Sequence, residues 1–240
     1  MPNDFAASVE YYNCILDPKQ FKKNAQFVAK VLRKHKVKTV LDVGCGTGIY
    51  TIPLSKKFSV EGLDINNEAM KFLRKKGIKT HNKSMVDFSL GKKYDAIICM
   101  TSTLLLVNSS SIAKTLKRFR THLKEGGIVI IELSNLEQEI KENNFTQSHE
   151  RYQLRDGVLD VIFKDYKREN KWVVEWHGFV QRENSFEEFV EQYEEFIIPI
   201  KKIDEMVKKA DFTILQTYGK RDGSEPFRKS SEKKVYVLQK

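Results

Sequence analysis

Three glycines within one short segment are the first residues whose type and spacing predict chemistry. The segment VLDVGCGTG, residues 40–48, places Gly44, Gly46 and Gly48 directly after a short apolar run. Glycine is required where a backbone approaches a ligand closely or adopts a positive φ angle. Open α/β sheets bind ligands at the carboxyl ends of their strands. We therefore expect this turn to lie against a small molecule.

A carboxylate follows the glycines at a sequence separation that is typical of nucleotide-binding α/β folds. Asp64 ends the run VEGLD, twenty residues after Gly44. An acid at the end of the second strand accepts hydrogen bonds from the two hydroxyls of a ribose. The alternative is a turn that only connects a strand to a helix, and such a turn needs no acid. The turn and Asp64 together predict an adenosine site.

The spacing of the glycines also bears on which adenosine ligand is bound. Dinucleotide sites carry GxGxxG, with the amino end of a helix directed at a pyrophosphate. This chain has GxGxG, and Ile49 stands where the third glycine is expected. The spacing favours a ligand without pyrophosphate, and an NAD-dependent oxidoreductase is the alternative of a different class.

The elements that must position this site alternate between helix and strand. The spacing of Phe21, Ala25, Val28 and Leu32 predicts helix within the first 36 residues. Further along the chain we expect strands at 38–43, 59–63, 79–82, 94–100 and 128–133, helices at 48–58, 67–76 and 109–123, and a turn at 124–127. This order predicts right-handed crossovers and an α/β, doubly wound, mostly parallel sheet.

The alternation of helices and strands stops after the fifth strand. Three segments at 151–154, 159–167 and 172–181 alternate like antiparallel strands, separated by turn signals at 155–157 and 169–171. A helix at 201–210 and a hairpin of strands at 213–218 and 234–238 complete a seven-stranded sheet. We expect a body formed by 1–135 and 200–240, and an antiparallel β insertion at 136–199 that covers the substrate.

The glycine segment resembles the first motif of the class I S-adenosylmethionine-dependent methyltransferase family. Its DxGxGxG pattern is matched by Asp42, Gly44, Cys45, Gly46, Thr47 and Gly48, and the likeness continues through SMVDF at 84–88 and LKEGG at 123–127. The resemblance implies a Rossmann-like methyltransferase fold with S-adenosyl-L-methionine as cofactor. It places the glycine backbone on the methionyl part of the donor and Asp64 on its ribose. The donor-binding set that it implies is Tyr12, Lys19, Asp42, Gly44, Cys45, Gly46, Thr47, Gly48, Asp64, Ile65, Ser84, Met85, Asp87 and Met100.

The adenine contact departs from the family pattern. Relatives often carry an acidic residue near position 84 that bonds the adenine amino group, and this chain has Ser84. That contact is left to the Ser84 hydroxyl, to Met85 and its backbone, or to Asp87. The alternative for Met85 is a place in the core.

The amino-terminal run is similar to the Y-D-x-I-Y-x-x-K-D-Y entry helix of a small-molecule subgroup that includes amino-sugar N-methyltransferases. Tyr12, Ile15, Lys19 and Phe21 match it, whereas Asn13, Leu16 and Gln20 depart from it. The resemblance places Tyr12 over the methyl group and Lys19 beside the methionyl carboxylate. The alternative is an amphipathic helix whose aromatic residues pack on the sheet.

Methyl transfer from a sulfonium is an in-line displacement, so positioning supplies much of the barrier reduction. A neutral amine needs little acid–base machinery, whereas a hydroxyl needs a base or a metal. The fourth strand ends in Met100-Thr101-Ser102-Thr103, without the NPPY run of enzymes that methylate exocyclic base amines. Thr101 and Ser102 either line the transfer site or form a simple turn.

No catalytic base is assigned from the sequence. Polar and aromatic candidates in the fifth strand or the insertion are Glu132, His149, Tyr152, Trp176 and His177. Strand alternation predicts one face with Trp172, Val174 and Trp176, and another with Val173, Glu175 and His177.

Composition predicts a cytoplasmic globular protein. The 240 residues contain no apolar run long enough to cross a bilayer, and the first residues lack the pattern of a signal peptide. Three cysteines far apart form no metal-binding pattern. The net charge of +10 is spread over lysine pairs that favour solvated helix faces. We predict a methyltransferase acting on a small molecule, such as an amine, with no membrane partner. An RNA or protein methyltransferase, which the charge would suit, is the alternative.

Overall fold

The computed structural model describes residues 9–16 and 18–240, and its largest unit is a seven-stranded sheet. Its strands are β1 (Thr39–Val43), β2 (Ser59–Asp64), β3 (Thr80–Asn82), β4 (Tyr94–Cys99), β5 (Leu123–Ser134), β10 (Thr213–Tyr218) and β11 (Lys233–Gln239), in the order β10-β11-β5-β4-β1-β2-β3. The β11 strand runs opposite to the other six, so its pairings with β10 and β5 are antiparallel and the remaining pairings are parallel. The predicted doubly wound, mostly parallel sheet is confirmed.

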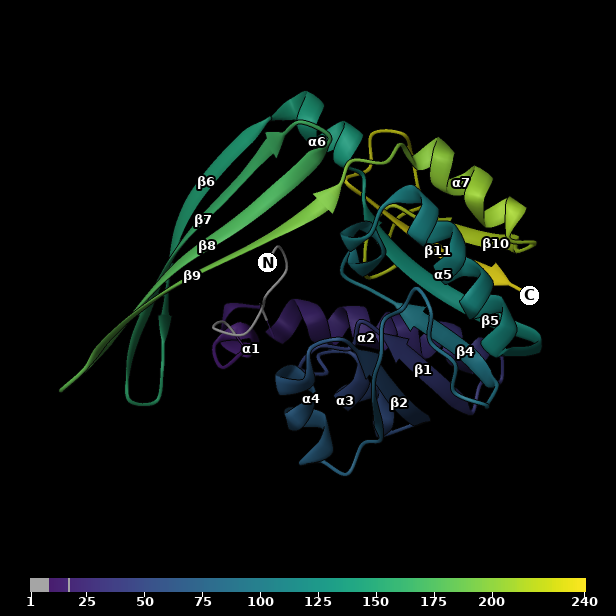
Figure 1. Ribbon diagram of the computed structural model, residues 1–240, viewed down its shortest axis with the longest axis horizontal. Coiled ribbons are helices and arrows are strands. Elements are labelled where there is room, and N and C mark those ends of the chain that lie inside the picture. The colour runs from purple at the N-terminus through teal and green to yellow at the C-terminus, as the bar shows by residue number, and fades with distance from the viewer. Residues whose placement is uncertain (1–8, 17) are drawn as a thin grey trace.

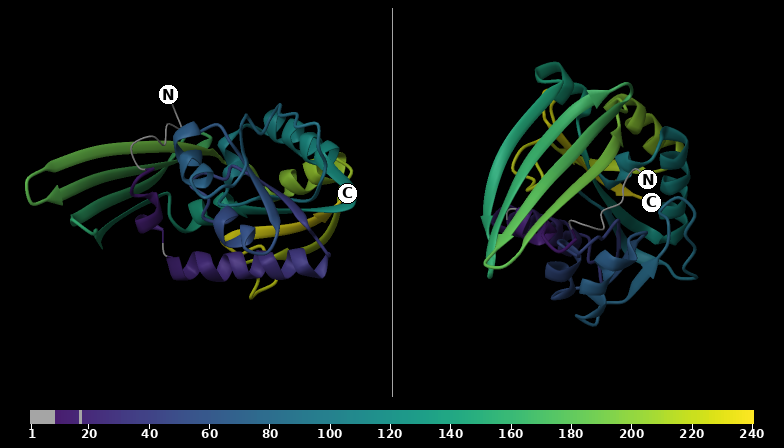
Figure 2. Two further views of the ribbon diagram at one scale, coloured as in Figure 1. Left: turned by 90° about the horizontal axis from the view of Figure 1, so that it is seen from below. Right: turned by 60° about the vertical axis from the view of Figure 1, so that its left-hand side comes forward.

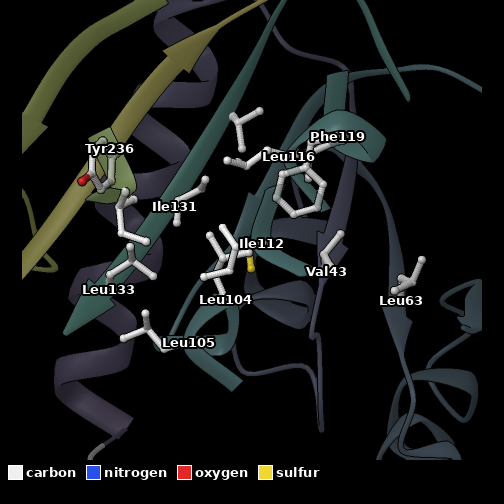
Figure 3. Close-up of a cluster of buried hydrophobic side chains, with 14 of the residues drawn as sticks. Val43, Leu63, Leu104, Leu105, Ile112, Leu116, Phe119, Ile131, Leu133 and Tyr236 are labelled. Atoms are coloured by element: carbon white, nitrogen blue, oxygen red, sulfur yellow. The ribbon is translucent and has the colours of Figure 1, made fainter. Parts of the chain in front are cut away.

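Helices cover both faces of this main sheet, because both faces of its central strands are apolar. One face packs on α2 (Pro18–Lys34) and α3 (Thr51–Ser55), and the other on α5 (Ser109–His122) and α7 (Ile200–Lys209) (Figure 2). Along β4, Ile98 packs on the first face and Ile97 on the second, as strand alternation requires. Figure 3 shows the second cluster, in which Leu116 and Phe119 of α5 lie over the sheet. α4 (Asn67–Arg74) follows β2.

A second, antiparallel sheet follows β5 and α6 (Leu136–Glu142). Its strands are β6 (Phe145–Gln153), β7 (Gly157–Arg168), β8 (Lys171–Arg182) and β9 (Phe186–Phe196), paired in chain order. Figure 1 shows a curved sheet that extends away from the main one, with α1 (Tyr12–Ile15) beside it. We call the face that carries Trp176 the inner face, because its residues join the main core. The insertion after the fifth strand is confirmed as an antiparallel β unit.

Strand β9 is one of the elements that the sequence did not predict. Its sequence FEEFVEQYEEF contains five glutamates, and glutamate is depleted in strands. The pairing register with β8 places Glu191 opposite Trp176 and Glu195 opposite Trp172, so these carboxylates lie on the inner face. The acidic run therefore forms a strand, and part of it points inward.

Several boundaries also differ from the prediction. The amino-terminal helix is two helices, and α2 begins at Pro18, a residue favoured in a first helical turn. The helix predicted at 48–58 is shortened to α3. The predicted turn at 124–127 is included in β5, where a register shift against β4 takes up the extra residues. Helix α6 was not predicted.

No helix among the described residues is long and apolar enough to cross a membrane. In the same part of the chain, no group of three or more His, Cys, Asp or Glu side chains is arranged to hold a metal ion.

Candidate functional site

The glycine turn between β1 and α3 has a backbone that only glycine adopts easily. Gly44 has a φ of +73°, and its amide donates to the Leu63 carbonyl at 2.8 Å. A Cβ at Gly44 would lie 2.2 Å from Thr103 Cγ2, so a side chain there would collide with the segment that follows β4. Gly46 has a φ of +48° and nothing within 4 Å of its Cβ position. The turn therefore presents bare backbone to open space at Gly46.

Asp64 lies beside this turn at the carboxyl end of β2. Its Oδ2 accepts from the Gly46 amide at 2.8 Å, and its Oδ1 accepts from the Asn66 amide at 2.8 Å. Burial raises the pKa of Asp64, and the backbone amides oppose that rise. Each carboxylate oxygen keeps a further lone pair for a hydroxyl donor. The next side chain, Ile65, is 66% exposed, so an apolar surface adjoins the acid.

The side chains of Asp42 and Cys45, the next motif residues, are buried and pack against the turn. Asp42 is buried, accepts from Thr51 Oγ1 at 2.5 Å, and has its pKa raised to about 7 by desolvation. Cys45 is buried, and a Cβ at Gly62 would lie 2.7 Å from its Sγ. These side chains shape the turn, so a donor would meet mainly its backbone.

The residues predicted for the adenine side and the methyl group have different surroundings. The hydroxyl of Ser84 accepts from the Val86 amide at 3.2 Å, and Met85 packs against the core. Asp87 lines a depression beside α5, together with Lys114. Met100 is buried on the α2 face of the sheet. Asp87 is exposed and Met100 is buried, and all four residues stay predictions for the donor site.

Helix α1 joins the glycine turn to the second sheet. Thr47 Oγ1 donates to Asn13 Oδ1 at 2.8 Å. The ring of Tyr12 stacks on Trp176 with centroids 5.7 Å apart, and burial raises the pKa of Tyr12 to about 12. Lys19 is exposed in the first turn of α2. The short helix therefore places an aromatic residue between the two sheets.

The carboxyl end of β4 has unusual backbone geometry. Thr101 and Ser102 have φ angles of 53° and 57°, which cost non-glycine residues roughly 1–3 kcal/mol each. Glu132 of β5 holds both residues: its Oε2 accepts from the Thr101 amide at 2.6 Å, and its carbonyl accepts from the Ser102 amide at 3.1 Å. Its Oε1 accepts from Arg221 Nε at 3.1 Å. Strained residues held in this way often mark functional sites.

The inner face of the second sheet adds buried carboxyl groups. Desolvation raises the pKa of Asp165 to about 6 and that of Glu195 to about 8. Lys233 lowers the pKa of both carboxyl groups, and its Nζ donates to Ser134 Oγ at 2.8 Å. No sequence pattern predicted a functional role for Asp165, Glu195, Arg221 or Lys233. Glu132 was a candidate because it is a charged residue within an apolar strand.

The histidines of the insertion lie on the opposite face. The register places His177 opposite Ile162, out of phase with Trp176, as alternation predicts. His177 pairs with Glu175 at 2.7 Å, and the half-exposed His149 pairs with Asp160 at 2.8 Å. Tyr152 is on the inner face and donates to Glu150. Neither histidine is therefore positioned between the sheets.

Comparisons with known proteins agree with this geometry. The family model described as "Methyltransferase domain" matches residues 16–217. Over 120 residues, 48% of this chain and 47% of the relative, the sequence is 32% identical to a dTDP-3-amino-3,6-dideoxy-alpha-D-glucopyranose N,N-dimethyltransferase from Streptomyces fradiae. The chain thus spans about half the length of that relative.

Two solved structures share the whole fold. An S-adenosylmethionine-dependent methyltransferase from Clostridium acetobutylicum is 19% identical, with a TM-score of 0.81 over 97% of this chain and 96% of that one. An amino pentose methyltransferase from Micromonospora echinaspora, solved with S-adenosylmethionine bound, is 17% identical, with a TM-score of 0.77 over 100% and 98%.

Proposed function

This chain belongs to the methyltransferase domain family, and we propose that it transfers a methyl group from S-adenosylmethionine to a nitrogen of a small molecule. The observation that carries the proposal is the Asp64 carboxylate held at 2.8 Å from the bare backbone of Gly46. This arrangement suits a ribose beside a ligand that lies on the turn. The second sheet, reached through Tyr12 and Trp176, supplies a separate surface for an acceptor.

The donor fits the residues that are present. The open space at Gly46 admits the methionyl chain, Asp64 accepts from the ribose hydroxyls, and exposed Ile65 offers an apolar surface to adenine. Asp42, Cys45, Thr47 and the two flanking glycines hold the shape of the turn. We assign Ser84 and Met85 to the adenine side, Lys19 to the methionyl end and Tyr12 to the methyl end. This assignment is part of the proposal.

Nitrogen is the acceptor atom that this site serves best. The lone pair of a neutral amine attacks the methyl carbon, the carbon–sulfur bond breaks with its electrons remaining on sulfur, and the amine proton leaves to solvent or a nearby carboxylate. Positioning accounts for most of the rate in such a step. Similarity to a sugar N,N-dimethyltransferase supports the same choice.

The second sheet is proposed to close over the acceptor. We assign donor binding to 1–135 with 200–240, and acceptor enclosure to 136–199. The carboxyl oxygens of the buried Glu191 and Glu195 on its inner face can accept hydrogen bonds from an amine, whereas a polyanion has no donor to offer them. RNA is therefore the weaker alternative despite the net charge of +10. We keep a cytoplasmic location as part of this proposal.

Calorimetry tests the donor first. S-adenosylhomocysteine is expected to bind, and NAD is not. Transfer of labelled methyl from S-adenosylmethionine is then measured with a dTDP-amino sugar, glycine and a short RNA. Incorporation into an amine is the expected result, whereas tight NAD binding without S-adenosylhomocysteine binding would overturn the proposal. Transfer of the labelled methyl group to RNA alone would show that the acceptor is a nucleic acid and not a small amine.

A further inference from the structure

The pair formed by Glu132 and Arg221 joins three segments at the carboxyl end of the main sheet. The Glu132 side chain has no exposed surface, and both of its carboxylate oxygens accept hydrogen bonds, one from the Thr101 amide and one from Arg221 Nε. A buried carboxylate is costly unless it is paired and hydrogen-bonded. The pairing therefore fixes the segment after β10, which carries Arg221, against the turn after β4.

Arg221 uses only part of its hydrogen-bonding capacity. Its Nε donates to Glu132 at 3.1 Å, and its Nη atoms make no hydrogen bond or ion pair within the described residues. The side chain is 28% exposed. A guanidinium held by Nε has its two Nη groups directed away in a planar fork, which matches the two oxygens of a carboxylate or phosphate.

The surroundings of Arg221 come from both sheets. Its charge lowers the pKa of Tyr12, Tyr50 and Tyr193, in each case against the upward effect of burial. Tyr50 follows the glycine turn by two residues, Tyr12 is in α1, and Tyr193 is on the inner face of β9. The Arg221 charge therefore acts on side chains from the glycine-turn side and from the inner face of the second sheet.

We propose that Arg221 binds an anionic oxygen group of a ligand between the two sheets, and that Glu132 is the positioning residue that directs the guanidinium there. The inference rests on the proposed function. Two ligands can bring such a group: the donor, through its methionyl carboxylate, or the acceptor, through a carboxylate or phosphate. The chemistry of recognition is the same, and binding experiments separate the two sources.

The experiment compares wild-type protein with Arg221→Gln by calorimetry. The probes are S-adenosylhomocysteine, 5′-methylthioadenosine, which lacks the amino-acid group, and thymidine diphosphate added to protein saturated with S-adenosylhomocysteine. If the donor brings the anion, Arg221→Gln weakens S-adenosylhomocysteine roughly tenfold or more and leaves 5′-methylthioadenosine unchanged. If the acceptor brings it, thymidine diphosphate binding falls instead by a similar factor.

Other outcomes overturn the inference. Arg221 binds no anion if the folded variant keeps wild-type affinity for all probes. The same conclusion holds if both adenosine probes lose affinity equally and thymidine diphosphate loses none. A wild-type protein that fails to bind S-adenosylhomocysteine would instead refute the proposed function. The control Lys220→Gln removes the neighbouring exposed cation, which pairs with Glu225, and is expected to bind every probe like wild type.

Glu132→Gln tests the positioning role. The amide keeps the size of the side chain but removes the counter-charge of Arg221 and one acceptor. Glu132→Gln is expected to weaken binding of the same probe that Arg221→Gln weakens and to leave the other probes unchanged. The double variant is expected to lose little more affinity for that probe than Arg221→Gln alone. A lower melting temperature with unchanged probe selectivity would show a structural role only, and would overturn this part of the inference.

Discussion

The glycine turn and the inner face of the second sheet meet at α1, but they are built from different parts of the chain. The turn offers backbone at Gly46 and one carboxylate at Asp64. The inner face offers side chains, with Trp176 at its centre and the buried Glu195 near the main sheet. One surface is defined by φ angles, and the other by which side chains the strands carry.

This difference suggests a division of tasks. A backbone-built surface binds a constant ligand, because its geometry depends on a few glycines and little on other side chains. A surface of side chains on a sheet changes its charge and shape with single substitutions, while the pairing of the strands is kept. We expect the first surface to determine donor binding and the second to determine the acceptor.

Gly44→Ala is expected to have the largest effect. The added Cβ meets Thr103 at 2.2 Å with φ at +73°, so strain and overpacking together destabilise the fold by about 2–5 kcal/mol. Gly126→Ala is the matched control, because Gly126 has a φ of +70° but no atom within 4 Å. Chemical denaturation measures both variants. Equal losses would show that the contact with Thr103 carries no cost.

Asp64→Ala is expected to weaken S-adenosylhomocysteine by roughly 1.5–3 kcal/mol, the scale of hydrogen bonds to a charged group. The loss arises because the ribose hydroxyls lose their acceptor and the Gly46 amide loses its partner at 2.8 Å. Calorimetry measures the affinity, and the melting temperature reports the fold. An unchanged affinity in a folded variant would remove Asp64 from the donor surface.

The burial of Glu195 in the second sheet is tested by the pH dependence of the unfolding free energy. The pKa of Glu195 is raised to about 8 by desolvation, partly offset by Lys233, so the folded state holds its proton more tightly than the unfolded state. Stability from this group is therefore lost as pH rises between about 4.5 and 8. Relative to wild type, Glu195→Gln is expected to gain about 2 kcal/mol between pH 6 and pH 8.

The control for this profile is Glu188→Gln, which changes an exposed glutamate on the opposite face of the same strand. Its unfolding free energy is expected to follow that of wild type across the same pH range. If Glu195→Gln also follows wild type, Glu195 is not held in a desolvated place between the sheets.

The same difference explains what the sequence could predict. The turn and Asp64 are local features, in which glycine spacing and strand order determine the geometry, and the main sheet follows from alternating periodicity. Glu132 and Arg221 are 89 residues apart and meet only because β11 pairs with β5. Nothing local indicates that contact.

Strand β9 shows the opposite limitation. Its glutamates have low strand propensity, and tertiary pairing with β8 overrides that preference. The inward direction of Glu195 depends on register, which a sequence of mixed polar residues does not fix. The inward carboxyl groups of β9 could therefore not be predicted, whereas the shared face of Trp172 and Trp176 followed from strand alternation.

The smallest expected effect concerns the link between the two surfaces. Asn13 is exposed and accepts from Thr47 Oγ1 at 2.8 Å, so Asn13→Ala removes one neutral hydrogen bond worth about 1 kcal/mol. If α1 helps to shape the donor surface, S-adenosylhomocysteine binding weakens by roughly that amount.

The control variant Asn13→Asp keeps an acceptor for Thr47 and is expected to bind S-adenosylhomocysteine like wild type or more tightly, because a charged acceptor strengthens the hydrogen bond. Calorimetry on the three proteins measures this, with the melting temperature as the check on folding. Unchanged binding in Asn13→Ala would assign α1 to the second sheet alone, through the stacking of Tyr12 on Trp176.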